Sequence, residues 1–235
     1  MNRLASALAC DVRLQVRNGF YYAAAFVALV VAAVFSRLPL GEAKWILPAL
    51  LFSNLMIGTF YFVGGLVLLE KAERTLDALV VTPLRPSEYL ASKTLSLTGL
   101  ALVENLIIVW LAYGTDFQVL PALAGMALIS ILYALLGFAA VIRYDSINEY
   151  LLPSFVYTLL ISLPLIDYFG FWRSWIFYLH PMQAPLILLK AAFLPVQAWE
   201  AVYGILYSAL WIGLMMHWSR RAFRRFVIAR EGGRR

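Results

Sequence analysis

Six apolar runs, each close to the length that crosses a lipid bilayer, constrain this chain more than any other feature. They extend over about Phe20–Ser36, Trp45–Leu69, Thr94–Gly114, Val119–Ile142, Tyr150–Ile166 and Trp199–Trp218. A membrane-spanning helix needs roughly 20 apolar residues. Since 63% of the 235 residues are hydrophobic and 14% are charged, a soluble core could not bury this surface. The sequence predicts an all-α polytopic membrane protein with six transmembrane helices in one domain, residues 1–235.

Lys and Arg are distributed unequally between the two sides that six spans define. Fifteen of the 19 lie on the side of the two termini, and seven of these are arginines in the last 16 residues. The positive-inside rule places that side in the cytoplasm, so we expect a bacterial inner-membrane protein with both termini cytoplasmic. Residues 219–235 form a basic tail that suits an anionic lipid surface, which accounts for the net charge of +6 without nucleic-acid binding.

Two further segments flank or interrupt the spans. Within residues 1–18 an apolar residue recurs at every fourth position (Leu4, Leu8, Val12 and Val16), which predicts a helix lying in the cytoplasmic membrane interface. Residues 167–198 are rich in Trp, Tyr and Pro, which predicts short interfacial or re-entrant helices on the outer side. A belt that only caps the protein and a lid over a transport path use the same residues, so both interpretations stay open.

Several classes of chemistry are excluded by missing motifs. Nowhere is a Gly followed by Lys, so the chain lacks a phosphate-binding loop and cannot hydrolyse nucleotide by that route. It also lacks the metalloprotease signature and the nucleophile elbow of serine hydrolases. His180 and His217 have no metal-ligand spacing around them, and Cys10 has no evident base. We therefore expect a non-enzymatic chain with no cofactor or metal of its own.

Polar residues within the predicted spans are few. Glu104 lies near the middle of the third span, next to Asn105, and Asn54 lies within the second. An ionisable group at this depth costs several kcal/mol unless it is paired, hydrated or protonated. Glu104 either lines a transport path and contacts a cationic substrate, or joins helices or subunits through hydrogen bonds; both interpretations stay open. Tyr61 and Tyr157 are weaker candidates for the surface of the path.

The connector between the second and third spans, Glu70–Lys93, is too long and too patterned for a simple turn. Leu76, Leu79 and Val80 are spaced at i, i+3 and i+4, which predicts one apolar stripe on a short helix. Such a cytoplasmic helix either packs back on the bilayer or fits a groove on a partner.

Two prolines divide this connector. Pro83 ends the short helix because it lacks an N–H donor and restricts the residue before it. Pro86 suits the first position of the next helix, with Glu88 in its first turn. The pattern predicts a short helix, a rigid corner and then a helix that continues into the third span.

These residues resemble those of a known family. Glu73-Arg74-Thr75-Leu76-Asp77-Ala78-Leu79, followed by Thr82-Pro83, resembles the E-x-G-T-L-E-x-L…T-P signature of ABC-2 type transporter permeases. Val80–Lys93 is similar to permeases of the fluoroquinolone-export subgroup, and the resemblance covers essentially the whole chain. The chain departs from the signature at Asp77, where Glu is common, and at Arg74, where the family often has Gly. The second departure predicts a more regular helix here.

The resemblance implies a half-transporter, the permease subunit of an ATP-binding cassette exporter of drug-like or amphipathic molecules. Its partners would be a separate ATPase that binds ATP and Mg, a second permease copy or related chain, and membrane lipid. The connector would be the coupling helix that docks on the ATPase. Its docking residues would be Glu73, Arg74, Thr75, Leu76, Asp77, Leu79, Val80, Thr82 and Pro83.

Other functions remain open. A permease of the same architecture for haem or lipid-linked cargo is one alternative. A secondary transporter or channel that needs no ATPase is another, of a different class. Many transporters of that class contain an internal repeat of their spans, and the connector has no counterpart after the fourth span.

Overall fold

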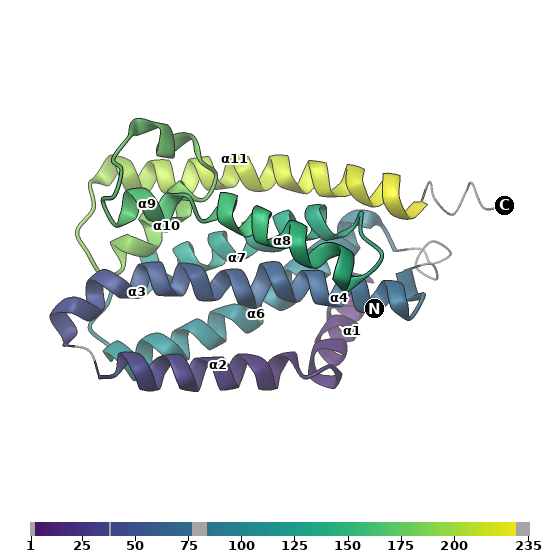
Figure 1. Cartoon of the computed structure of the whole chain (residues 1–235), viewed down its shortest axis with the longest axis horizontal. Coiled ribbons are helices and arrows are strands. Elements are labelled where there is room, and N and C mark those ends of the chain that lie inside the picture. Colours follow the sequence, from purple (N-terminus) through teal and green to yellow (C-terminus); the bar gives the residue numbers. More distant parts are fainter. Residues whose placement is uncertain (1–2, 38, 77–83, 229–235) are drawn as a thin grey trace.

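The computed structural model describes residues 3–37, 39–76 and 84–228, and these residues form helices joined by short connections. The long helices run side by side along the longest axis of the molecule (Figure 1). At the start of the chain are α1 (Arg3–Arg17), α2 (Phe20–Phe35), α3 (Leu40–Leu55), the π-helical turn η1 (Met56–Tyr61) and α4 (Phe62–Ala72). After the connector come α6 (Pro86–Tyr113), α7 (Val119–Val141), α8 (Ile147–Ile161), α9 (Pro164–Tyr168), η2 (Trp175–Leu179), α10 (Gln183–Ala191), α11 (Ala198–Phe223) and η3 (Arg224–Ile228).

Within the part of the chain that the structure describes, five helical segments are long and apolar enough to cross a membrane. They are Glu42–Ala72, Pro86–Tyr113, Val119–Val141, Ile147–Tyr168 and Ala198–Val227. The sixth candidate is the α1–α2 pair, which bends by 64° at its break, because α2 alone has only 16 residues. The predicted all-α polytopic membrane fold is therefore confirmed.

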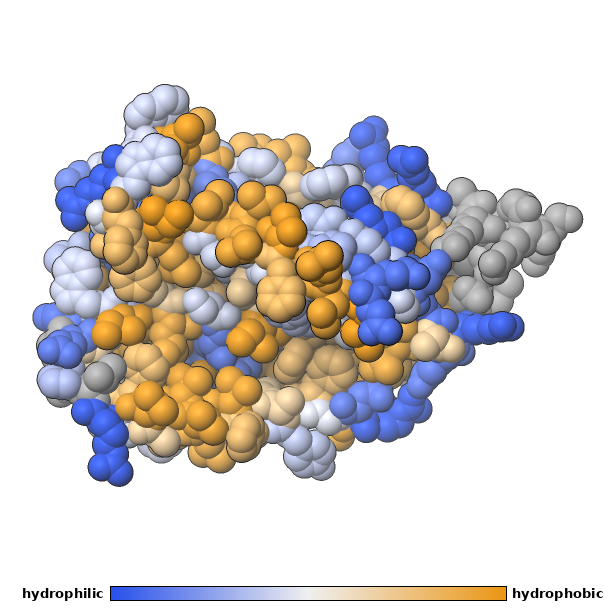
Figure 2. Space-filling model, in the orientation of Figure 1, coloured by the Kyte–Doolittle hydropathy of each residue, from blue (hydrophilic) through white to orange (hydrophobic). Residues whose placement is uncertain are grey.

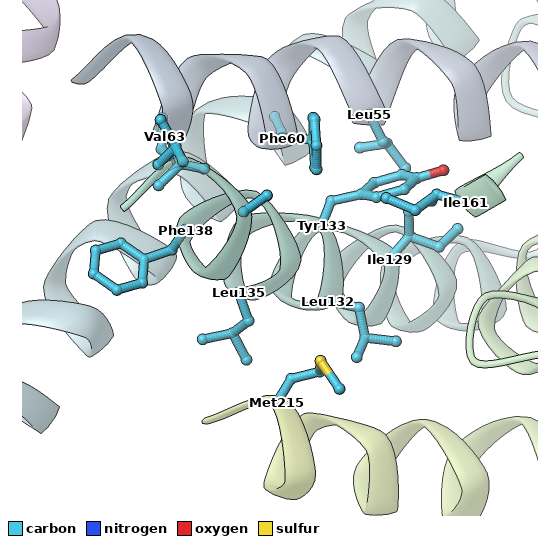
Figure 3. Packing of buried hydrophobic residues seen from close by; sticks show 14 of the residues in the cluster. Leu55, Phe60, Val63, Ile129, Leu132, Tyr133, Leu135, Phe138, Ile161 and Met215 are labelled. Atoms are coloured by element: carbon cyan, nitrogen blue, oxygen red, sulfur yellow. The ribbon is translucent and has the colours of Figure 1, made fainter. Parts of the chain in front are cut away.

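The core is built around α7, which is apolar on all of its faces, as expected for a buried helix. Figure 3 shows Tyr133 of α7 pointing towards Leu55 of α3, next to Phe60 of η1, while Leu132 points towards Met215 of α11. Tyr133 is completely buried. The helix α7 thus packs against α3 and η1 on one side and against α11 on another.

Large apolar side chains cover much of the outer surface. Leu152 and Leu159 of α8 are 74% and 71% exposed, and Leu206 of α11 is 65% exposed. Figure 2 shows hydrophobic side chains gathered over the middle of one face, with hydrophilic ones gathered at the end where α1 lies. Since a water-soluble surface does not expose so large an apolar band, lipid is the medium that suits it.

The two ends of the bundle differ in composition. The ends of α4, α7 and α11 lie together with α1 at one end of the bundle (Figure 1). We call this the basic end, because it carries Arg17, Lys71 and Arg143. The opposite end holds the connection between α8 and α11, with Trp172, Trp175 and many tyrosines, and we call it the aromatic end.

The helix α10 is part of the interior of the bundle at the aromatic end. It packs against α7 and α11, and glycines on both neighbours allow the close approach. A Cβ atom on Gly125 of α7 would lie 2.6 Å from the backbone N of Leu189, and one on Gly204 of α11 would lie 2.5 Å from Cγ of Leu188. The depth of this short helix therefore depends on the absence of two side chains.

The N-terminal helix α1 packs differently from the expectation of an apolar row. Its buried residues are Asp11 and Gln15, whereas Val16, at the end of that row, is 43% exposed. Asp11 and Gln15 lie one turn apart and face α6. Leu8 and Val12 of the apolar row are partly buried and line a groove with α2 and α6, so α1 contacts the protein with its polar row and with part of its apolar row.

Candidate functional site

The connector leaves and re-enters the bundle at the basic end. The helix α4 ends at Ala72, and α6 begins at Pro86, where Arg85 N–H donates to Oε2 of Glu88 over 2.8 Å. This confirms the predicted helix start at Pro86 with Glu88 in its first turn. The predicted docking residues Asp77, Leu79, Val80, Thr82 and Pro83 lie outside the described residues.

The prediction of a more regular helix at Arg74 is wrong. Arg74 has φ 57°, the left-handed conformation that side chains with a Cβ adopt at a cost and glycine adopts freely. It lies in the turn that follows α4, and the Thr75 hydroxyl donates to the Glu70 carbonyl over 3.1 Å. The backbone thus keeps the shape that the family's Gly suits, although the residue has changed.

The four described docking candidates divide into two kinds. Glu73, Arg74 and Thr75 are exposed, so their side chains are accessible to a partner. Leu76 is 2% exposed and belongs to the core of the protein. Leu76 therefore packs into the bundle, and its side chain is not accessible from the surface.

A buried ionic cluster joins both ends of the connector to α1. Lys93 of α6 is 1% exposed, and its Nζ lies 2.5 Å from Oε1 of Glu70 and 2.9 Å from Oδ1 of Asp11. The remaining carboxylate oxygens accept from the hydroxyls of Tyr89, over 2.5 Å to Glu70, and of Ser92 to Asp11. We call these five residues the Lys93 cluster.

Sequence reasoning missed this cluster. It treated Glu70 and Lys93 only as the first and last residues of the connector. A weak signal was present, because Asp11 and Gln15 are spaced i, i+4 as a polar row on α1. Gln15 makes a second contact of the same kind, since its Nε2 donates to the Ser96 hydroxyl over 2.8 Å.

A second cation ties the start of the connector to the loop between α7 and α8. Nζ of Lys71 donates to the carbonyls of Ile142 and Tyr144, each over 2.6 Å, and lies 3.5 Å from Oδ1 of Asp145. Lys71 thereby caps the carboxyl end of α7, where a cation is favourable. A displacement of the connector would consequently act on α1, α6 and the α7–α8 loop together.

Three of the five transport-path candidates come together inside the bundle. Nδ2 of Asn54 donates to Oε1 of Glu104 over 3.0 Å and to Oδ1 of Asn105 over 3.2 Å. The other oxygen of Glu104, Oε2, is buried and has no hydrogen-bond partner among the described residues. A Cβ atom on Gly58 of η1 would lie 3.2 Å from it, so the π-helical turn and its glycine leave room for this carboxyl. Such turns often occur at functional sites.

Tyr61 and Tyr157 are not part of this group. The Tyr61 hydroxyl donates to Oγ1 of Thr158 over 3.4 Å, and the hydroxyls of Tyr157 and Tyr144 are 3.2 Å apart. Both tyrosines thus lie at the contact with α8 and the loop before it. The predicted path residues form two separate polar groups.

A groove of about 460 Å³ leads to Glu104 from the surface of the bundle. Its walls come from α1, α2 and α6, and their side chains are apolar except for those of Tyr21, Ser96 and Glu104. Across residues 3–37, 39–76 and 84–228, no three His, Cys, Asp or Glu side chains are arranged to hold a metal ion. Because its walls are mostly apolar and include the Glu104 carboxyl, the groove can accommodate an apolar molecule with one polar or basic group.

Membrane-length helices around a buried carboxyl, with a charged connector anchored at one end, are features of a polytopic membrane transport protein. Residues 2–231 match the fluoroquinolones export permease protein family, and the chain belongs to this family. Two relatives are named fluoroquinolones export permease protein, from Mycobacterium tuberculosis strains CDC 1551 / Oshkosh and ATCC 25618 / H37Rv. Each is 34% identical to this chain over 235 residues, with 99% of both chains covered.

Proposed function

We propose that this chain is the permease subunit of an ATP-binding cassette exporter and is powered by a separate ATPase. Family membership supports a membrane permease for drug export, and the chain has no phosphate-binding loop with which to use ATP itself. The main support for coupling to an ATPase comes from the connector. It is exposed at residues 73–75, and the Lys93 cluster and Lys71 anchor it to the bundle.

The basic end faces the cytoplasm in this proposal, in accordance with the positive-inside rule. The ATPase docks on Glu73, Arg74 and Thr75 together with the residues that follow them. Because Lys93 bonds to Glu70 and Asp11, a shift of the docked connector moves α1 and α6 together. A second copy of the chain, or a related one, completes the transporter.

The cargo of this exporter is an amphipathic aromatic molecule, as the name of the relatives suggests. Its polar or basic group contacts Glu104, which lines the apolar groove and has one carboxylate oxygen without a partner among the described residues. The following experiments separate this proposal from three alternatives. These are a purely structural role for Glu104, a haem or lipid-linked cargo, and transport without an ATPase.

The docking role is tested by co-expressing the chain with a candidate ABC ATPase from the same genome. We expect the ATPase to co-purify, and a charge reversal at two exposed positions, Glu73→Lys with Arg74→Glu, to weaken this association at least about tenfold. The matched control is Glu42→Lys with Arg37→Glu at the aromatic end. The proposal would be contradicted if both double variants retained the ATPase equally. It would also be contradicted if no ATPase stimulated transport.

The path role is tested with inside-out vesicles and a fluorescent fluoroquinolone. We expect ATP-dependent uptake that falls at least about tenfold in Glu104→Gln, which keeps the shape and the bond from Asn54. Glu42→Gln, an exposed carboxyl outside the groove, serves as the control. Unchanged uptake in Glu104→Gln would assign this residue to structure alone.

A further inference from the structure

A second cavity, distinct from the Glu104 groove, opens at the aromatic end. It encloses about 1040 Å³ between the start of α3, α9, the 173–179 segment, α10 and the start of α11. Its walls are rich in aromatic rings, from Trp45, Tyr168, Trp175, Tyr178, Trp199, Tyr203 and Tyr207. A cavity of this size accommodates a drug-sized molecule. We call it the outer pocket.

The rings of the outer pocket are held in place by one another and by the backbone. The Tyr178 ring stacks on Trp199 with centroids 5.8 Å apart, and it contacts the Tyr203 ring with centroids 5.4 Å apart. The Tyr203 hydroxyl donates to the Tyr178 carbonyl over 2.5 Å, and the Tyr207 hydroxyl donates to the Leu179 carbonyl over 2.7 Å. A membrane belt needs only outward-facing rings, whereas this wall is fixed in shape before any ligand arrives.

Two carboxylates and a free amide oxygen lie among these rings. Gln183 is 4% exposed, and its Nε2 donates to Oδ2 of Asp167 over 2.8 Å, but its Oε1 has no partner among the described residues. Glu200 accepts from the Tyr178 hydroxyl over 3.3 Å. Burial together with this carboxylate raises the pKa of Tyr178 above its ordinary value, so the phenol stays a donor. Because both donors are neutral, these bonds do not neutralise the charge of Asp167 or Glu200.

From this arrangement we propose that the outer pocket binds an aromatic molecule that carries a protonated amine. The ammonium N–H groups donate to Oε1 of Gln183, which otherwise lacks a donor, and are attracted by the Asp167 and Glu200 carboxylates. The faces of the surrounding rings attract the same cation and stack on the ligand's aromatic part. Arg173 and Lys190 also line the pocket, but among the described residues neither forms an ion pair with Asp167 or Glu200. The buried group that lacks a partner, Oε1 of Gln183, is an acceptor and therefore suits a cationic donor rather than an anion.

The ammonium group has two sources in a membrane, a soluble aromatic amine and the headgroup of phosphatidylethanolamine. Both present N–H donors to Gln183, but only the first also has a ring for the aromatic wall. The experiment therefore varies the ligand and the lipid separately. It uses neither ATPase nor transport, so a failure of the proposed ATP coupling would leave its result unchanged.

The full chain is reconstituted in nanodiscs of phosphatidylglycerol, and binding of 1-phenylpiperazine is followed by quenching of tryptophan fluorescence. We expect saturable binding, and binding at least about tenfold weaker for 1-acetyl-4-phenylpiperazine, which has the same rings but no charge. Asp167→Asn and Gln183→Leu should each weaken binding of the amine by about tenfold. Glu42→Gln, at the same end but outside the pocket, should leave binding unchanged.

Glu200→Gln provides a further variant that removes the charge and keeps the size of the side chain, in case Gln183→Leu does not fold. If added phosphatidylethanolamine competes with the amine, and this competition is lost in Asp167→Asn, the pocket is supported and the lipid headgroup is an occupant. If the lipid does not compete with saturable amine binding, the pocket is supported and the soluble amine is its occupant. Equal binding of the charged and acetylated compounds, or folded Asp167→Asn and Glu200→Gln variants that bind like the original chain, would overturn the proposal.

Discussion

At the scale of single residues, the Lys93 ammonium serves two carboxylates from different helices. Lys93, Glu70 and Asp11 are all less than a tenth exposed, so solvent contributes little to any of their charges. Two negative groups for one positive group leave an excess negative charge, which the Tyr89 and Ser92 hydroxyls share. The cluster is therefore stable only as a complete set, and removal of one member exposes the others to the full cost of burial.

The first prediction concerns Lys93→Met. Loss of the cation leaves two buried carboxylates unpaired, and we expect the folded state to lose about 3–5 kcal/mol. The triple variant Asp11→Asn, Glu70→Gln and Lys93→Met should recover most of this loss, because neutral groups need no counter-ion. Thermal unfolding in detergent measures both. The control is Arg17→Met, which removes the exposed Arg17–Glu73 pair and should cost less than about 1 kcal/mol. A triple variant as unstable as Lys93→Met would contradict this account.

The second prediction concerns Arg74, whose φ of 57° belongs to the left-handed region. A residue with a Cβ adopts it at about 1–2 kcal/mol, so Arg74→Gly should be as stable as the original chain or more stable. Arg74→Val should be less stable by about 1 kcal/mol, because a branched Cβ fits this conformation worst. Arg85, with φ −78° and ψ 146°, provides the control, since there Val should be more stable than Gly. Melting temperatures that rank Gly and Val alike at both positions would refute the assignment.

At the scale of elements, the bundle depends on α10 lying close to α7 and α11. A short helix gains its position from its neighbours rather than from its own propensity. The contact of Gly125 is with the backbone of Leu189, which cannot rotate away as a side chain does. Any movement of α10 would also change the outer pocket, because Gln183 and Lys190 belong to both.

The third prediction is therefore that Gly125→Ala lowers the melting temperature and weakens amine binding in the outer pocket. The added methyl would lie 2.6 Å from Leu189 N and 2.8 Å from its Cα, so α10 must shift. Gly99→Ala is the matched control, because no atom lies within 4 Å of its Cβ position on α6. It should leave stability unchanged or raise it by up to about 1 kcal/mol. If both substitutions gave the same melting temperature, close packing at Gly125 would not control α10.

The elements that the sequence predicts well are those fixed by nearby residues. The start of α6 depends on Pro86 and Glu88, which act within one turn, and the long apolar runs specify their own helices. The Lys93 cluster could not be predicted in this way, because Asp11 and Lys93 are far apart in the chain and only the packing of α1 on α6 joins them. Arg74 shows the opposite case. Its residue type favours a helix, but the turn imposes the left-handed conformation.

At the scale of the whole molecule, a band of apolar surface separates a basic end from an aromatic one. Both ends suit a membrane boundary, since basic residues favour the cytoplasmic side and Trp and Tyr favour the interfaces. The Glu104 groove is lined by the α1–α2 corner, while the outer pocket lies at the other end. In the proposed orientation, an exported molecule would meet Glu104 first and the outer pocket last.

The fourth prediction tests this orientation with the chain's single cysteine. Cys10 is exposed at the basic end, so a membrane-impermeant maleimide should label it in inside-out vesicles but not in intact cells. Phe171 lies at the aromatic end and is 83% exposed. Phe171→Cys, combined with Cys10→Ser, should give the reverse pattern, and Cys10→Ser alone measures the background. Because the two sites differ only in the side of the membrane they face, labelling of Cys10 in intact cells with protection of position 171 would invert the topology. The exposed residues Glu73–Thr75 would then be unable to reach a cytoplasmic ATPase.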